Sequence, residues 1–267
     1  DADLYIRIGL ELEKAWEAPL LRGARNEKIQ LGTSGNLDVS LGVKKLGLPT
    51  QTVDRSMGDI HGEGNPHYWL DPYNGRLIAQ AIATRLSSID SNHADAYALA
   101  LAAFLRRLDE RMFGERLVTK FGGEVLWRED KTLQAFLSQH NALPELGGWR
   151  AHAIQFSGMA IVTFHSSWTY LADRFALPVA ETLEPKPGIP PSPGHLVNVI
   201  RAVQNSKVGL ILLEPFYERK VADFVGSKTE VPVAVVPNGA ADEGPDAYLN
   251  MLDHLVTVLR NAAARRS

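Results

Sequence analysis

The sequence contains no cysteine among its 267 residues. This absence excludes disulfide bonds and thiolate ligands, so any metal ion bound here must take nitrogen and oxygen ligands. No apolar run in the chain reaches the roughly 18 residues that a membrane-spanning helix needs. The net charge is −3, so the strongly basic balance typical of nucleic-acid-binding proteins is also absent, and we expect no nucleic-acid partner.

Several sequence motifs of enzymes are absent as well. The chain has no HExxH zinc motif, no GxSxG nucleophile motif and no glycine-rich phosphate loop. Ser166 and Ser167 stand beside His165, but neighbouring residues of a strand point to opposite faces and do not pair easily. We therefore expect that the protein is not an enzyme. A metal-dependent hydrolase with an open coordination position is the alternative.

Short apolar runs alternate with helical patterns along the chain. The runs predict strands at 4–8, at 160–164, at 208–213, at 231–236 and before Val53. The periodic segments predict helices at 12–21, 72–87, 91–112 and 245–260. This alternation predicts an α/β fold in which helices cover both faces of parallel sheets.

The stretch from Asn65 to Pro72, with the sequence NPHYWLDP, carries the most information. Asp71 suits a helix N-cap and Pro72 suits the first helical position, where a missing N–H costs nothing. His67 therefore lies a few residues before a well-defined helix start. A histidine can bind a metal ion from such a position, and a histidine buried in an aromatic corner is the alternative interpretation.

Three of the predicted strands end at polar side chains. These strands lead into His165, into Glu214, and into the turn from Asn238 to Asp242. Ligands of parallel α/β sheets bind beyond the carboxyl ends of the strands, so we expect these positions at one binding edge. Glu214 can be a metal ligand, a residue that orients a ligand, or part of a structural salt bridge.

Three blocks of sequence resemble the cluster A-I metal-binding receptors of bacterial ABC transporters, the zinc and manganese solute-binding proteins. The blocks are NPHYWLDP at 65–72, IVTFHSSWTYL followed by RFAL at 161–177, and EPKPGIPPSP at 184–193. Their order and spacing match, and the resemblance covers nearly the whole chain. It implies two lobes with parallel sheets flanked by helices, linked by one long rigid helix.

The resemblance also implies how the chain divides. We expect an N-terminal lobe at 1–90, a linking helix at 91–113, and a C-terminal lobe at 114–267 with an insertion at 114–158. Residues 2–13 are similar to a family segment that follows an N-terminal βα unit. We therefore expect that unit to be missing from this chain, together with its signal sequence and the first ligand histidine.

The function implied by the resemblance is capture of Zn²⁺ in the cleft between the lobes and delivery to the transporter's permease. Such a receptor lies in the periplasm or at the extracytoplasmic face of the cell membrane, and we expect it to be a monomer. Mn²⁺ is the alternative ion, because manganese receptors of the family carry Glu where this chain has His165. A metal-binding surface adhesin is a further alternative.

The resemblance implies that His67 and His165 are metal ligands. We prefer Asp242 over Asn238 as the oxygen ligand, because an anionic oxygen binds a dication better than an amide does. His61, in a glycine-rich loop, and Glu214 are secondary candidates, with a solvated loop histidine as the alternative for His61. Asp246 is predicted to start the last helix.

Overall fold

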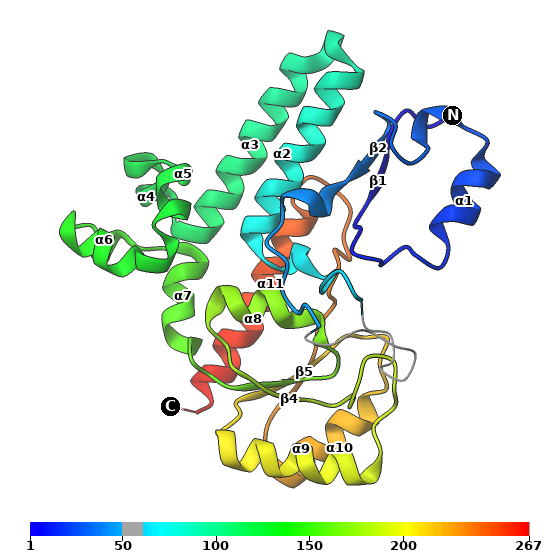
Figure 1. Cartoon of the computed structure of the whole chain (residues 1–267). Coiled ribbons are helices and arrows are strands. Elements are labelled where there is room, and N and C mark those ends of the chain that lie inside the picture. The colour runs from blue at the N-terminus through cyan, green and yellow to red at the C-terminus, as the bar shows by residue number, and fades with distance from the viewer. Residues whose placement is uncertain (50–60, 267) are drawn as a thin grey trace. The chain divides into compact units, whose positions relative to one another are not determined.

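The computed structural model describes residues 1–49 and 61–266 (Figure 1). The chain divides into two compact units. Unit 1 comprises Asp1–Val53 and His61–Arg107, and unit 2 comprises Asp54–Ile60 and Leu108–Ser267. The strand predicted before Val53 lies outside the described residues. Within the described residues, no helix has the length and apolar character needed to span a bilayer.

Unit 1 contains a small parallel sheet. Strand β1 (Tyr5–Arg7) pairs with β2 (Asn36–Asp38), with Ile6 opposite Leu37. The strand predicted at 4–8 is thus confirmed, whereas β2, with the polar sequence NLD, was not predicted. The other elements of unit 1 are α1 (Glu17–Ala24), η1 (Glu27–Ile29), η2 (Val39–Gly42), η4 (Tyr68–Leu70), α2 (Pro72–Ile89) and η5 (Ser91–His93).

The helix predicted at 12–21 is wrong at its start, because α1 begins only at Glu17. The three residues Gly9, Leu10 and Glu11 all have positive φ angles, of 75°, 51° and 65°. The Glu13 carboxylate accepts the backbone N–H groups of Ile8 at 2.7 Å and Gly9 at 3.0 Å, which stabilises this left-handed turn. The local hydrogen bonds therefore hold the chain out of a right-handed helix until Glu17.

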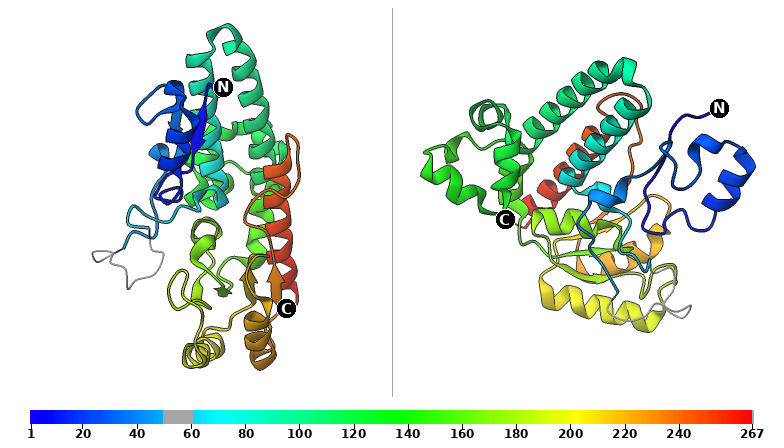
Figure 2. Two further views of the ribbon diagram at one scale, coloured as in Figure 1. Left: turned by 90° about the vertical axis from the view of Figure 1, so that its right-hand side faces the viewer. Right: turned by 45° about the horizontal axis from the view of Figure 1, so that its top comes forward.

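Helix α2 begins where the sequence predicts. Asp71 is its N-cap, the Asp71 carboxylate accepts the backbone N–H of Tyr73 at 2.9 Å, and Pro72 is the first helical residue. The helix α3 (Ala94–Phe113) follows after η5, and Figures 1 and 2 show α2 and α3 as neighbouring antiparallel helices. The boundary between the units, at Arg107–Leu108, falls inside α3. Its role as a rigid linker stays a prediction.

Unit 2 is built on a parallel sheet of four strands in the order β4-β3-β5-β6. The strands are β3 (Ile161–Thr163), β4 (Val179–Thr182), β5 (Leu210–Leu213) and β6 (Val233–Val235). All three neighbouring pairs are parallel. The predicted α/β fold with parallel sheets is confirmed, although β4 was not predicted.

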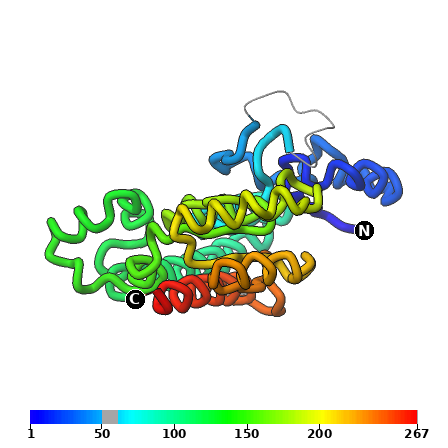
Figure 3. Tube along the Cα trace, turned by 90° about the horizontal axis from the view of Figure 1, so that it is seen from below, coloured from blue at the N-terminus to red at the C-terminus, as the bar shows by residue number. Residues whose placement is uncertain are grey.

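Alternation along the strands divides the side chains of this sheet between two faces. Val162, Phe164, Ile211 and Leu213 pack into an apolar cluster with residues of α9 (Pro193–Ser206) and α10 (Arg219–Thr229). These two helices lie side by side (Figures 1 and 3). The opposite face, which includes Thr163 and Leu212, is also buried, and α8 (Thr169–Phe175) lies on that side in Figure 1.

Most of the remaining helices of unit 2 lie in the segment 114–158, which was predicted as an insertion. The remaining helices are α4 (Glu115–Phe121), α5 (Gly123–Arg128), η6 (Asp130–Thr132), α6 (Leu133–Gln139), η7 (Leu143–Glu145), α7 (Gly148–Phe156), η8 (Ser166–Trp168) and α11 (Ala247–Ala264). Helix α7 packs on α11, and the Trp149 indole N–H donates to Asp253 at 2.7 Å.

The end of α3 and the start of α7 meet at a close contact between two glycines, Gly114 and Gly147. The backbone N–H of Gly147 donates to the carbonyl of Phe113 at 3.0 Å. Gly114 has a φ of 88°, and a Cβ on it would come within 2.8 Å of the Gly147 Cα. Glycine is therefore required at position 114 on two grounds, backbone conformation and space.

Candidate metal-binding site

His67 lies in unit 1, immediately before η4, and its ring orientation is fixed by Asn65. Its Nδ1 lies 3.0 Å from the Asn65 Oδ1, and the same Oδ1 accepts the backbone N–H of His67 at 2.9 Å. Because the backbone N–H can only donate, the shared atom is the amide oxygen, and Nδ1 carries the proton. The ring lone pair is therefore on Nε2, the atom through which a neutral imidazole would bind a metal ion.

The backbone around His67 is held by buried residues that follow it. Tyr68 is fully buried, and its hydroxyl donates to the carbonyl of Ile8 in the turn after β1. The Asn74 amide of α2 donates to the Tyr68 carbonyl at 2.9 Å, and Trp69 lies with its ring centroid 5.3 Å from that of His67. The aromatic residues of the motif thus anchor the loop, while the His67 ring itself remains half-buried.

His165 follows β3 at the carboxyl edge of the unit 2 sheet, and its side chain is 14% exposed. Its Nδ1 lies 2.7 Å from Oε2 of Glu184. Since a carboxylate only accepts, Nδ1 donates, and the lone pair is on Nε2 as in His67. A carboxylate behind a ligand histidine fixes the ring and raises its basicity, which is the usual arrangement around a bound metal ion.

Glu184 is the carboxylate beside His165, and it was not among the residues predicted from the sequence. It follows β4, its backbone N–H donates to the Phe164 carbonyl at 3.0 Å, and its side chain is almost fully buried. Because β4 runs parallel to β3, the residue after β4 comes to lie beside the residue after β3. The only signal in the sequence was an acidic residue opening the proline-rich stretch, and recognising its role required β4 to be predicted.

We expect substitution of Glu184 to weaken metal binding, because it weakens or removes the hydrogen bond that holds Nδ1 of His165. Glu184→Gln keeps an acceptor oxygen and loses the charge, so the affinity for Zn²⁺ should fall by about tenfold, and Glu184→Ala by about 100-fold. Glu181→Gln on β4 is the matched control, because the Glu181 carboxylate accepts the N–H of the neighbouring Thr182 and makes no contact with His165 in the described part of the chain. Competition with a chromogenic chelator measures the affinities. Equal affinities for all the variants would contradict an orienting role.

Glu214 follows β5 and is completely buried among other polar groups. Neither oxygen of its carboxylate makes a hydrogen bond within the described residues, and the same holds for the hydroxyls of Thr163 and Ser167 and the indole N–H of Trp168. Burial raises the pKa of Glu214, and the nearby Ser167 hydroxyl opposes this most strongly, although it does not meet hydrogen-bond geometry. A salt bridge, one of the three readings for Glu214, is not found there in the described part of the chain.

The raised pKa predicts a specific pH dependence of stability in the metal-free protein. The folded state retains the Glu214 proton above pH 4.5, the ordinary pKa, whereas the unfolded state releases it. Unfolding therefore releases a proton, and this contribution to stability decreases as the pH rises from about 4.5 towards the folded-state pKa. One proton contributes at most about 1.4 kcal/mol per pH unit.

Denaturant unfolding between pH 5 and pH 8 measures this effect, with Glu214→Gln as the comparison, because the amide is neutral at every pH. The difference in unfolding free energy between the variant and the wild type should shift in favour of the variant as the pH rises. A difference that stays constant across this range would contradict a raised pKa of Glu214.

The other predicted residues are exposed or half-buried. Asp242 is exposed in the loop after β6, and Asp246 is at the N-cap of α11, as predicted. His61 is half-buried in its loop, where the next N–H, that of Gly62, donates to Glu11 at 2.6 Å.

The structure brings His165 beside Glu184 and close to Glu214 at one end of the unit 2 sheet. His61 and His67 belong to unit 1, while His165, Glu214 and Asp242 belong to unit 2. Among residues 1–49 and 61–266, no group of three or more His, Asp or Glu side chains is placed to hold a metal ion. The full ligand set therefore stays a prediction.

Ser167 does not form a hydrolase-like pair with His165. Ser167 is 1% exposed, and its hydroxyl makes no hydrogen bond with His165 or with any other described residue. His165 donates instead to Glu184, and the Ser167 side chain lies beside Glu214. The hydroxyl of Ser167 is therefore not activated by His165, as a serine nucleophile paired with a histidine would be.

The family model and the individual relatives that match this chain agree with each other. The family described as zinc-uptake complex component A, periplasmic (ZnuA), matches residues 1–112 and 130–262. The chain is similar to the high-affinity zinc uptake system protein ZnuA of Brucella suis biovar 1, with 24% identity over 76% of this chain and 52% of that protein. It is also similar to the manganese ABC transporter substrate-binding lipoprotein PsaA of Streptococcus mitis, with 22% identity over 99% of this chain and 74% of that protein.

Among solved structures, the Zn(II)-bound E280Q variant of AdcAII from Streptococcus pneumoniae has the same fold. The TM-score is 0.65, at 23% identity, over 98% of this chain and 80% of that one. The chain spans about half the length of the Brucella proteins that it matches.

Proposed function

The chain belongs to the ZnuA family of periplasmic zinc-uptake components, and from this premise we propose that it is an extracytoplasmic receptor for Zn²⁺. In this proposal the protein binds the ion and delivers it to the permease of an ABC transporter, and it is not an enzyme. Mn²⁺ is the alternative ion, because relatives named for zinc and for manganese both match this chain.

One observation carries the proposal, namely that His67 and His165 have the same ring tautomer, with the proton on Nδ1. Each histidine lies within a block of sequence that resembles the family, and each Nδ1 is held by an oxygen acceptor, the amide of Asn65 or the carboxylate of Glu184. This arrangement puts the lone pair on Nε2 in both rings, as metal binding requires. Two imidazoles favour Zn²⁺, which nitrogen ligands bind at about 2.0–2.1 Å.

We assign His67 and His165 as ligands and Glu184 as the residue that orients His165. Asp242 is the proposed oxygen ligand, and its exposed loop would have to order when the ion binds. His61 and Glu214 remain secondary candidates. Glu214 is completely buried, so its side chain would have to move before it could bind the ion. We propose that the two units correspond to the two lobes of the receptor.

Metal binding by the full-length protein tests the proposal. We expect one Zn²⁺ per chain, measured by mass spectrometry under native conditions, and a higher affinity for Zn²⁺ than for Mn²⁺, measured by calorimetry. No turnover of ester, phosphate or peptide substrates is expected. Hydrolysis that depends on zinc would favour the hydrolase instead, and the absence of stoichiometric metal binding would refute both.

A further inference from the structure

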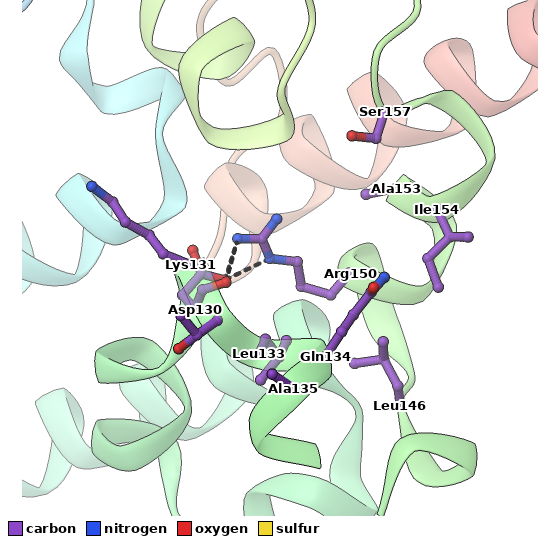
Figure 4. A pocket seen from close by; sticks show the side chains of 11 residues that line it. Asp130, Lys131, Leu133, Gln134, Ala135, Leu146, Arg150, Ala153, Ile154 and Ser157 are labelled. Carbon is purple, nitrogen blue, oxygen red and sulfur yellow. Dashed lines mark hydrogen bonds and ion pairs between the residues drawn. The ribbon is translucent and has the colours of Figure 1, made fainter. Parts of the chain in front are cut away.

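A pocket with a volume of about 540 Å³ lies in unit 2 between α6 and α7 (Figure 4). Its lining does not include any residue that we propose for zinc binding. Sites for small molecules in proteins usually have volumes of roughly 300–1,000 Å³. The pocket is therefore large enough for a small organic molecule.

One part of the lining is apolar. Leu133 of α6, Leu146 of the loop before α7, and Ala153 and Ile154 of α7 contribute to it. Ile154 is 59% exposed, so a large aliphatic side chain remains in contact with water at this wall. A hydrocarbon chain placed against these residues would remove apolar surface from water on both sides of the contact.

The other part of the lining carries fixed positive charge. The Arg150 Nε–H donates to Oδ1 of Asp130 at 2.5 Å, and its other nitrogens donate to the carbonyls of Asp130 and Arg174. Oδ2 of Asp130 accepts from Arg174. Figure 4 shows the Arg150 side chain running along the pocket towards Asp130, whereas the Lys131 side chain starts beside Asp130 and extends away from Arg150.

These contacts determine which charge a ligand should have. The Asp130 carboxylate is 3% exposed and is shared by two guanidinium groups, so its negative charge is already committed. The exposed Lys131 adds a further positive charge to the lining. A guanidinium held in one orientation binds an anion without losing side-chain freedom, which favours a negatively charged ligand.

We propose that this pocket binds a small organic carboxylate with a short aliphatic chain. The carboxylate lies near Arg150, and the chain lies against Leu133, Leu146 and Ile154. This site is independent of the proposed zinc site, since the two share no residue. Loss of zinc binding would leave this proposal unaffected.

Titration of the ¹⁵N-labelled protein with hexanoate, followed by NMR, tests the proposal. Saturable shifts confined to the amides of 130–157 are expected. Hexanamide has the chain without the charge and acetate has the charge without the chain, so each should bind at least about tenfold more weakly than hexanoate. Equal binding of hexanamide would identify an apolar crevice and overturn the proposal, as would the absence of saturable shifts in this region.

Two substitutions at exposed positions separate binding from folding. Ile154→Asp should abolish the hexanoate shifts, whereas Gln155→Asp, the same charge at a neighbouring exposed residue outside the lining, should preserve them. Lys131→Glu should weaken hexanoate binding at least about tenfold by removing a cation and adding an anion. If Ile154→Asp and Gln155→Asp bound hexanoate equally well, the pocket would not be the binding site.

Discussion

Replacement of His165 by alanine is expected to weaken Zn²⁺ binding by more than about 100-fold. The loss of a partner behind a ligand histidine already costs about 10- to 100-fold in affinity, and loss of the ligand itself should cost more. The substitution also leaves the buried Glu184 carboxylate without its 2.7 Å partner. The metal-free protein should therefore lose about 1–3 kcal/mol of stability while remaining folded.

The increase in Tm on adding zinc separates these two effects, because a ligand that binds only the folded state raises Tm by an amount that grows with the logarithm of its affinity. The wild type should show a large increase and His165→Ala almost none. His152→Ala, at a half-buried position on α7, is the control and should keep the increase. If His165→Ala unfolded without metal, or kept the full increase, His165 would be a structural residue.

His67→Ala is expected to have an effect of similar size, more than about 100-fold in Zn²⁺ affinity, because its ring is held by Asn65 in the tautomer that binds metal. His61→Ala should reduce the affinity by less than about tenfold. His61 precedes the rigid motif, and the backbone N–H of the next residue in its loop, Gly62, donates to Glu11. That contact does not depend on the His61 side chain.

Calorimetric titration of the two variants side by side, at a pH where histidines are neutral, measures this difference. The metal-free Tm values should stay close to each other, since both side chains are half-buried and neither belongs to the apolar core. Equal losses of affinity would make His61 a direct ligand. A large loss for His61 alone would exclude His67 as the main ligand of unit 1.

The parts of the site that could be predicted depend on local sequence signals. The start of α2 was predictable because Asp71 and Pro72 each have one preferred place at a helix N-terminus. The strands before His165 and Glu214 were predictable because they are continuous apolar runs, buried on both faces of the sheet. Both predictions follow from residues that are adjacent in the chain.

The parts that were missed depend on pairing between distant segments. Strand β4 has the sequence VAET, which is half-exposed and too polar to stand out, and its place is determined by its pairing with β3. Glu184 reaches His165 only because of that pairing. Asn65 holds His67 through side-chain geometry that no composition rule describes, and the left-handed turn at Gly9–Glu11 depends on the Glu13 carboxylate.

The close contact between Gly114 and Gly147 bears on how this protein can change in evolution. The segment between these glycines begins and ends at the same place in the structure, because Gly114 and Gly147 are in contact. A segment of different length can therefore take its place without moving α3 or α7. Changing the length of such a segment costs little, because closure entropy grows only slowly with the number of residues. The stretch that the family does not match, 113–129, begins at this point. Relatives should therefore differ in length mainly here, while their sheets keep the same register.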